Sequence, residues 1–183
     1  HMTAFTYRFV PAMRYLKHLV DRGELGTPYH YRSCRLQDWG TRNVGWRQVK
    51  RLAGTGEIGD MLSHRIDFAH HLIGPMSRLV ANLKNLTPMR DGAPNDTDDW
   101  VAILAEFKCG ASGVLESSKL ASGTNESWRS PDRVELNGSA ASISIVPAPS
   151  SPASAPVAAK TTNAPRVRDF RGVLISRALS VAG

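Results

Sequence analysis

Apolar residues recur at helical spacing in two segments of the chain. In the first, Pro11 suits the first turn of a helix and Gly26 suits the loop after its end. Its apolar stripe, which would face a core, consists of Met13, Leu16, Leu19 and Val20. A second helix is predicted after Gly59, and the pair Gly74–Pro75 would end it.

The rest of the body alternates between apolar and polar residues, which predicts β-strands. The segments with this pattern are residues 28–39, 77–87, 99–118 and 132–146. The third segment contains two strands with a tight turn at Lys108–Gly110, and the fourth is a hairpin with Asn137–Gly138 as its turn. Helices early in the chain and strands afterwards predict an α+β fold: an open, mostly antiparallel sheet with helices on one face.

The chain has 183 residues, 42% of them hydrophobic, which suits one domain with a substantial core and a tail. We interpret residues 1–2 as a tag remnant and residues 3–146 as the domain. Residues 147–183 are expected to be a linker and a poorly specified tail, because their first half is rich in Pro, Ala and Ser. No apolar run approaches the ~20 residues that span a bilayer, so we expect no membrane partner.

The net charge of +7 at pH 7 raises the question of nucleic-acid binding. More than half of this excess lies in the tail from Pro147 onward, and the rest is scattered without interleaved aromatic residues. The pattern therefore favours a solvated surface over a nucleic-acid partner. Cys34 and Cys109 are far apart and lack metal-ligand spacing, which predicts two reduced thiols in a cytoplasmic protein.

Gly54, Gly56 and Gly59 spell G-x-G-x-x-G, the letters of a dinucleotide-binding fingerprint. That fingerprint requires a buried strand before the glycines and a second strand soon after the following helix. The preceding residues, "WRQVKRLA", are too polar for a buried strand, and no second strand closes the unit. The motif on its own is a weak indication of a pyrophosphate site.

The helix after Gly59 places four ionisable side chains on one face: Asp60, His64, Asp67 and His71. Three interpretations are open for this stripe. It is a solvated or hydrogen-bonded face, or a metal site begun by Asp60 and His64, for which no third ligand is apparent. Alternatively it serves acid–base chemistry, with His64 as the titrating group and an ionised Asp60, one turn away in the first turn of the helix, as its orienting carboxylate.

Four stretches together resemble the C-terminal domain of the Gfo/Idh/MocA family of NAD(P)-dependent sugar and polyol oxidoreductases. They are "YRFVPAMRYLKHLVDRGELGTPYHYRS", "GWRQVKRLAGTGEIGDMLSHRIDFAHHLIGP", "NDTDDWVAILAEFKCGASGVLESS" and "VELNGSAASI". The resemblance covers residues 5 to about 146, and its most specific part is the glycine run followed by Asp60 and His64. In that family this run leads to the active-site helix, so the resemblance implies that the three glycines belong to the substrate side.

The resemblance also implies a mechanism. His64 would take a proton from a substrate hydroxyl, Asp60 would orient the imidazole or its partners, and hydride would pass to the nicotinamide. Trp46 and Arg47 match a Trp-Arg pair that often precedes the glycines, and would line the same cleft. We also assign substrate contacts to Asp38 and Trp39, which end the first strand.

The family's dinucleotide-binding domain, with its own glycine fingerprint and a Glu-Lys-Pro motif, has no counterpart in this chain. We therefore expect NAD or NADP in the full-length enzyme and no cofactor on this chain, which alone should not turn over substrate. Two hypotheses remain. The chain is the substrate-binding half of a sugar or polyol dehydrogenase that forms homo-oligomers through its sheet face, or a stand-alone, non-catalytic module for self-association or for binding a partner or sugar.

Overall fold

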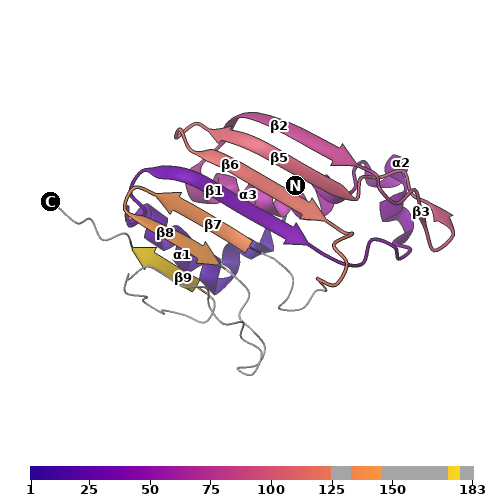
Figure 1. The fold of residues 1–183 in the computed structure, drawn as a ribbon, viewed down its shortest axis with the longest axis horizontal. Coiled ribbons are helices and arrows are strands. Elements are labelled where there is room, and N and C mark those ends of the chain that lie inside the picture. The colour runs from indigo at the N-terminus through magenta and orange to yellow at the C-terminus, as the bar shows by residue number, and fades with distance from the viewer. Residues whose placement is uncertain (125–132, 146–172, 178–183) are drawn as a thin grey trace, which may run out of the picture.

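The computed structural model describes residues 1–124 and 133–145, together with the backbone of residues 173–177. One sheet has the strand order β2-β5-β6-β1-β7-β8-β9 (Figure 1). Its strands are β1 (Pro28–Leu36), β2 (Met76–Lys84), β5 (Trp100–Phe107), β6 (Ser112–Ser118), β7 (Arg133–Gly138), β8 (Ala141–Ile145) and β9 (Val173–Arg177). β1 and β6 pair in parallel, and the other neighbours in this sheet are antiparallel. The predicted open, mostly antiparallel sheet is confirmed.

Two helices, α1 (Pro11–Asp21) and α3 (Ser63–Ile73), lie on one face of this sheet (Figure 1). Pro11 takes the first turn of α1, where its missing N–H breaks no helical hydrogen bond. α3 continues from η3 (Ile58–Leu62), a single π-helical turn, and ends at Gly74, whose φ of +94° suits a residue without Cβ. Both predicted helices are confirmed, and in the described ranges no helix has the length and apolar character to cross a membrane.

The core lies between the helices and the sheet. Each strand from β5 to β8 sends alternate side chains toward the helices, as the period of two requires. The buried residues on the sheet side include Tyr31, Val101, Ile103, Leu115, Leu136 and Ile143, and those on the helices include Met13, Leu16, Phe68 and Leu72. The helices do not cover β2 at the edge of the sheet, and all its residues after Met76 are exposed.

The hairpin β7–β8 is present, but its predicted turn at Asn137–Gly138 is wrong. Asn137 pairs with Ser142, so the chain reverses after Gly138, which is still part of β7. A Cβ on Gly138 would overlap the backbone oxygen of Leu25. The glycine is therefore required by the close approach of the α1–β1 loop, a long-range contact that overrides the local turn signal. The other predicted turn is confirmed, since Gly110 has φ of +89° and closes β5 onto β6.

The remaining short elements are η1 (Thr6–Phe9), η2 (Gly45–Gln48), α2 (Lys50–Ala53) and the hairpin β3 (Met89–Arg90) with β4 (Ala93–Pro94). Of the predicted tail, the structure describes the backbone of β9, which adds the last strand to the sheet beside β8. The other residues of 147–183 lie outside the described ranges, and the boundary at residue 146 stays a prediction. Cys34 and Cys109 are thiols and form no disulfide.

Candidate functional site

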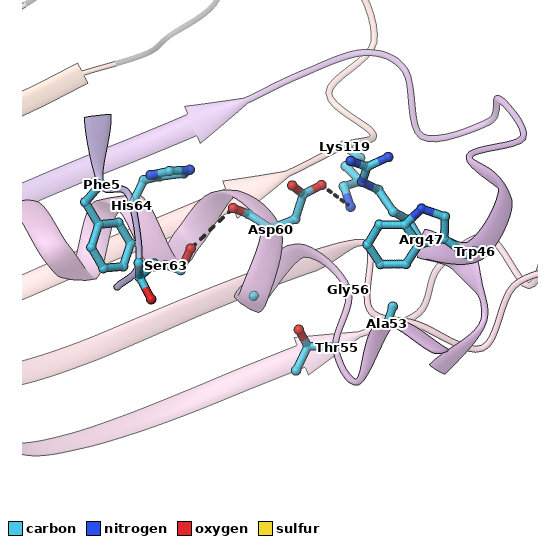
Figure 2. A pocket seen from close by; sticks show the side chains of 12 residues that line it. Phe5, Trp46, Arg47, Ala53, Thr55, Gly56, Asp60, Ser63, His64 and Lys119 are labelled. Carbon is cyan, nitrogen blue, oxygen red and sulfur yellow. Dashed lines mark hydrogen bonds and ion pairs between the residues drawn. The ribbon is translucent and has the colours of Figure 1, made fainter. Parts of the chain in front are cut away.

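A cavity of about 430 Å³ lies at the start of the π-helical turn η3 and the helix α3. Its lining comes from parts of the chain that are distant in sequence, and Figure 2 shows it from close by. The side chains that matter for its chemistry are Phe5, Trp46, Arg47, Asp60, His64 and Lys119. Aromatic, cationic, acidic and imidazole groups therefore surround one space large enough for a small molecule.

The glycine run forms one wall of this cavity. A Cβ on Gly56 would overlap the backbone of Asp98, and a Cβ on Gly59 would overlap Thr55. The Asp98 carboxylate accepts hydrogen bonds from the amides of Gly56, at 2.7 Å, and Ile58, at 2.8 Å. Residues preceding Gly54 form α2, not a strand. Gly56 thus lets the chain pass close to the loop before β5, and the run lacks the preceding strand that a dinucleotide fingerprint requires.

Asp60 points toward Lys119 rather than toward His64 (Figure 2). Its Oδ2 lies 3.2 Å from Lys119 Nζ, and the described residues contain no hydrogen bond between Asp60 and His64. The Asp60 side chain is 32% exposed and the Lys119 side chain 1%, so the pair lies at the cavity floor. Asp60 is therefore placed to contact both Lys119 and a ligand in the cavity. Its predicted catalytic role stays a prediction.

Lys119 and Glu57 are site residues that the sequence analysis did not find. Lys119 Nζ lies 3.3 Å from Glu57 Oε2 and 4.9 Å from the centre of the Trp39 ring. Ser117 donates a hydrogen bond from its hydroxyl to Glu57. Burial raises the pKa of Glu57 to about 7, although Ser117 and Lys119 act in the opposite direction. Two features of the sequence could have indicated these residues: a lysine at the end of an alternating strand, and a glutamate within the glycine run.

The His64 imidazole packs edge-on against two aromatic rings of the N-terminal segment. The ring centres lie 5.7 Å away for Phe5 and 5.0 Å away for Tyr7. Nδ1 is buried and has no hydrogen-bond partner among the described residues. Burial, followed by the charge of Arg65, lowers the pKa of His64, so the neutral imidazole is favoured at pH 7. Nε2 is then the nitrogen left to take a proton from a ligand in the cavity.

The predicted stripe of four ionisable residues is divided in the structure, because only two of them lie at the cavity. Asp60 and His64 line the cavity, whereas Asp67 and His71 do not. Asp67 is buried and accepts hydrogen bonds from the guanidinium of Arg8. The physical reason is that η1 packs on this side of α3 and brings its own cation to the buried carboxylate.

The remaining predicted contact residues fall into two groups. Trp46 and Arg47 line the cavity, and the Arg47 guanidinium stacks 4.8 Å from the Trp46 ring centre. Asp38 and Trp39 do not line it. Asp38 accepts a hydrogen bond from the amide of Gly123 at 2.7 Å, and the Trp39 ring packs against the ammonium of Lys119. Substrate contact stays a prediction for all four. In the described ranges no three His, Cys, Asp or Glu side chains gather as metal ligands.

Residues 13–144 match the family model described as GFO/IDH/MocA C-terminal domain. The chain belongs to this family. The resemblance noted in the sequence is thereby confirmed, and the glycine run with Asp60 and His64 lies within the matched residues.

The chain is similar to levoglucosan dehydrogenase of Pseudarthrobacter phenanthrenivorans, with 34% identity over 146 residues that cover 68% of this chain and 37% of that protein. It is also 38% identical over 85 residues to an uncharacterized oxidoreductase of Synechocystis sp., covering 43% of this chain and 22% of the relative.

Solved structures show the same likeness in three dimensions. Levoglucosan dehydrogenase in complex with NADH and levoglucosan superposes with a TM-score of 0.73 at 34% identity, covering 80% of this chain and 40% of that one. An oxidoreductase domain protein from Kribbella flavida gives a TM-score of 0.71 at 33% identity, covering 78% and 39%. The chain thus spans about two fifths of the length of these relatives.

Proposed function

We propose that this chain is the substrate-binding and self-association domain of a nicotinamide-dependent dehydrogenase that acts on a sugar or polyol. The observation that supports it is one cavity that brings His64, Asp60, Trp46 and Arg47 together in a member of this family. Similarity to a levoglucosan dehydrogenase favours a sugar as the ligand. Alone, the chain should bind its sugar weakly and not oxidise it.

In the proposed reaction, His64 is the general base. Its low pKa keeps the imidazole neutral, and the buried, unpartnered Nδ1 leaves Nε2 to take the proton of a substrate hydroxyl. The exposed Trp46 ring offers an apolar surface to the C–H face of a sugar, and Arg47 donates hydrogen bonds to its hydroxyls. Lys119 holds the Asp60 carboxylate at the cavity floor, where it accepts a hydrogen bond from a second hydroxyl.

The hydride acceptor in this proposal is NAD or NADP. The glycine run does not fit a dinucleotide site, because it follows a helix and not a strand, and its Gly56 packs against the Asp98 backbone. The dinucleotide would therefore be held by other residues of the whole protein, and no step here depends on its geometry.

The test compares turnover with binding. The complete gene product, assayed for NAD- or NADP-dependent oxidation of levoglucosan and a panel of sugars and polyols, should lose about 10²-fold or more in kcat on His64→Ala. The variant should keep its circular dichroism spectrum and its thermal midpoint. Turnover that is unchanged by His64→Ala would remove His64 from the mechanism. Absence of sugar oxidation together with sugar binding would favour the stand-alone binding module.

We also propose that the open sheet face mediates self-association. Val80 and Leu104 are neighbours in register on β2 and β5 and are 73% and 63% exposed. They border a hollow of about 510 Å³ together with Val114. An apolar, uncovered sheet surface of this kind is usually an interface. Sedimentation velocity should show a dimer or larger assembly that Leu104→Glu dissociates; a monomer for both proteins would contradict the proposal. A cytoplasmic location stays a prediction.

A further inference from the structure

The first residues of the chain lie across the start of α3, where they cover His64. We call residues 3–9 the N-terminal strap. Thr3 and Phe5 line the cavity, and Figure 2 shows the Phe5 ring next to the imidazole. Tyr7 meets His64 with its ring centre at 5.0 Å and Phe68, one turn further along α3, at 5.6 Å. Two strap rings therefore pack against the imidazole, and one of them, Phe5, also lines the cavity.

One ion pair fastens the strap to α3. Arg8 donates from Nε to Asp67 Oδ2 at 2.8 Å and from Nη2 to Asp67 Oδ1, which makes a bidentate contact. The Asp67 side chain is 6% exposed, whereas that of Arg8 is 40% exposed. A buried carboxylate needs a partner of this kind, and a fork with two hydrogen bonds fixes direction as well as distance. Asp67 lies three residues after His64, so the contact sets the strap against the same turn of the helix.

We propose that Arg8 and Asp67 are positioning residues for His64: their contact holds the strap so that Phe5 and Tyr7 keep the imidazole shielded and oriented at the cavity. The inference deepens the proposed function, because it explains how the general base of that reaction is prepared. It gives a task to Asp67, which does not line the cavity. It also gives a task to the aromatic residues of the strap, which the sequence analysis left unassigned.

The strap and the surrounding charges act on His64 in ways that can be separated. Burial is the largest cause of its low pKa, and Arg65 and Arg35 lower it further. Asp60 and Asp67 act in the opposite direction and raise it. Loss of the Asp67 charge alone would therefore lower the pKa of His64. Release of the strap would expose the imidazole and raise its pKa. In a variant that lacks the Asp67 charge, these two effects change the pKa of His64 in opposite directions.

The experiment is an NMR titration of the histidine ring signals in this chain, comparing the unmodified protein with Asp67→Asn and Phe5→Ala. We expect the pKa of His64 to rise in both variants toward its ordinary value of about 6.5. The His64 ring protons should also lose the ring-current shift that the two aromatic neighbours impose. Arg8→Lys, which keeps the charge but loses the fork, should give an intermediate change.

Glu106→Gln is the matched control, because Arg78 and Glu106 form another bidentate pair, on the exposed part of the sheet. It should leave His64 unchanged. If Asp67→Asn lowers the pKa of His64 or leaves it in place, with the ring-proton shifts retained, the proposal is overturned. Should Asp67→Asn not fold, the double variant Arg8→Gln/Asp67→Asn removes both charges and tests the same release.

These readouts need neither sugar nor turnover. A failure of the proposed dehydrogenase function would leave the titration result intact. Conversely, an unchanged His64 in the strap variants would overturn the positioning role while a His64-dependent oxidation of sugar still stood.

Discussion

Lys119 and Glu57 form an ion pair of 3.3 Å between Nζ and Oε2, and neither side chain is more than 1% exposed. The same ammonium reaches Asp60 at 3.2 Å, so one cation contacts a buried carboxylate and a carboxylate that lines the cavity. A buried ion pair of this kind contributes little net stability, but removal of one partner is costly because the other charge is left uncompensated.

Lys119→Met should destabilise the chain at pH 8, where Glu57 is largely ionised. The expected loss is about 3 kcal/mol in the free energy of unfolding, because two carboxylates lose their cation. Lys119→Met/Glu57→Gln should recover part of that loss. Urea denaturation of the two single variants and the double variant forms a cycle that measures the coupling. Strict additivity would contradict the ion pair.

Glu57 should make the stability depend on pH. Its pKa is raised above its ordinary range to about 7, so the folded state holds the proton that the unfolded state releases near its ordinary value. The stabilisation is complete below the unfolded pKa and is lost as pH rises from about 4.5 to 7. Glu57→Gln should flatten the dependence of unfolding free energy on pH in that window, and an unchanged slope would count against the buried, protonated Glu57.

Trp46→Ala should weaken sugar binding without weakening the fold. The ring is 55% exposed and lies at the cavity, so little of its area is buried until a ligand arrives. We expect an approximately tenfold loss of affinity for levoglucosan, equivalent to about 1.4 kcal/mol, and a change in unfolding free energy within about 0.5 kcal/mol. Calorimetric titration measures the first and urea denaturation the second. Leu52→Ala, another exposed apolar residue, is the control and should change neither.

Gly56→Ala should disturb the cavity wall more than Gly54→Ala. At Gly56 the added methyl group overlaps the Asp98 backbone, so the loop must move. At Gly54 the space is open, and the cost is that of the backbone conformation alone (φ +78°, ψ −46°), about 1–3 kcal/mol. The measurements are the unfolding free energies and the amide shifts of Gly56 and Ile58, which donate to Asp98. Equal effects of the two substitutions would contradict the role of close approach.

Local patterns in the sequence were sufficient for most elements of the fold. The apolar stripe of α1, the stop at Gly74 and the alternation of β5 and β6 are determined by neighbours within a few residues. The spacing of Asp60 and His64, four apart, likewise places both at one cavity because they share a helical face. The family resemblance added Trp46 and Arg47, which also reach this cavity.

Contacts between distant segments were decided by the tertiary structure. Glu57 meets Lys119, Asp67 meets Arg8, and Leu25 displaces the turn expected at Asn137. A periodic pattern reports which face of an element is apolar, but it does not report which charge on another element arrives at a buried carboxylate. Burial makes such a partner necessary. The contact of Asp60 with Lys119, and that of the N-terminal strap with His64, therefore follow from tertiary packing and not from the spacing of residues in the sequence.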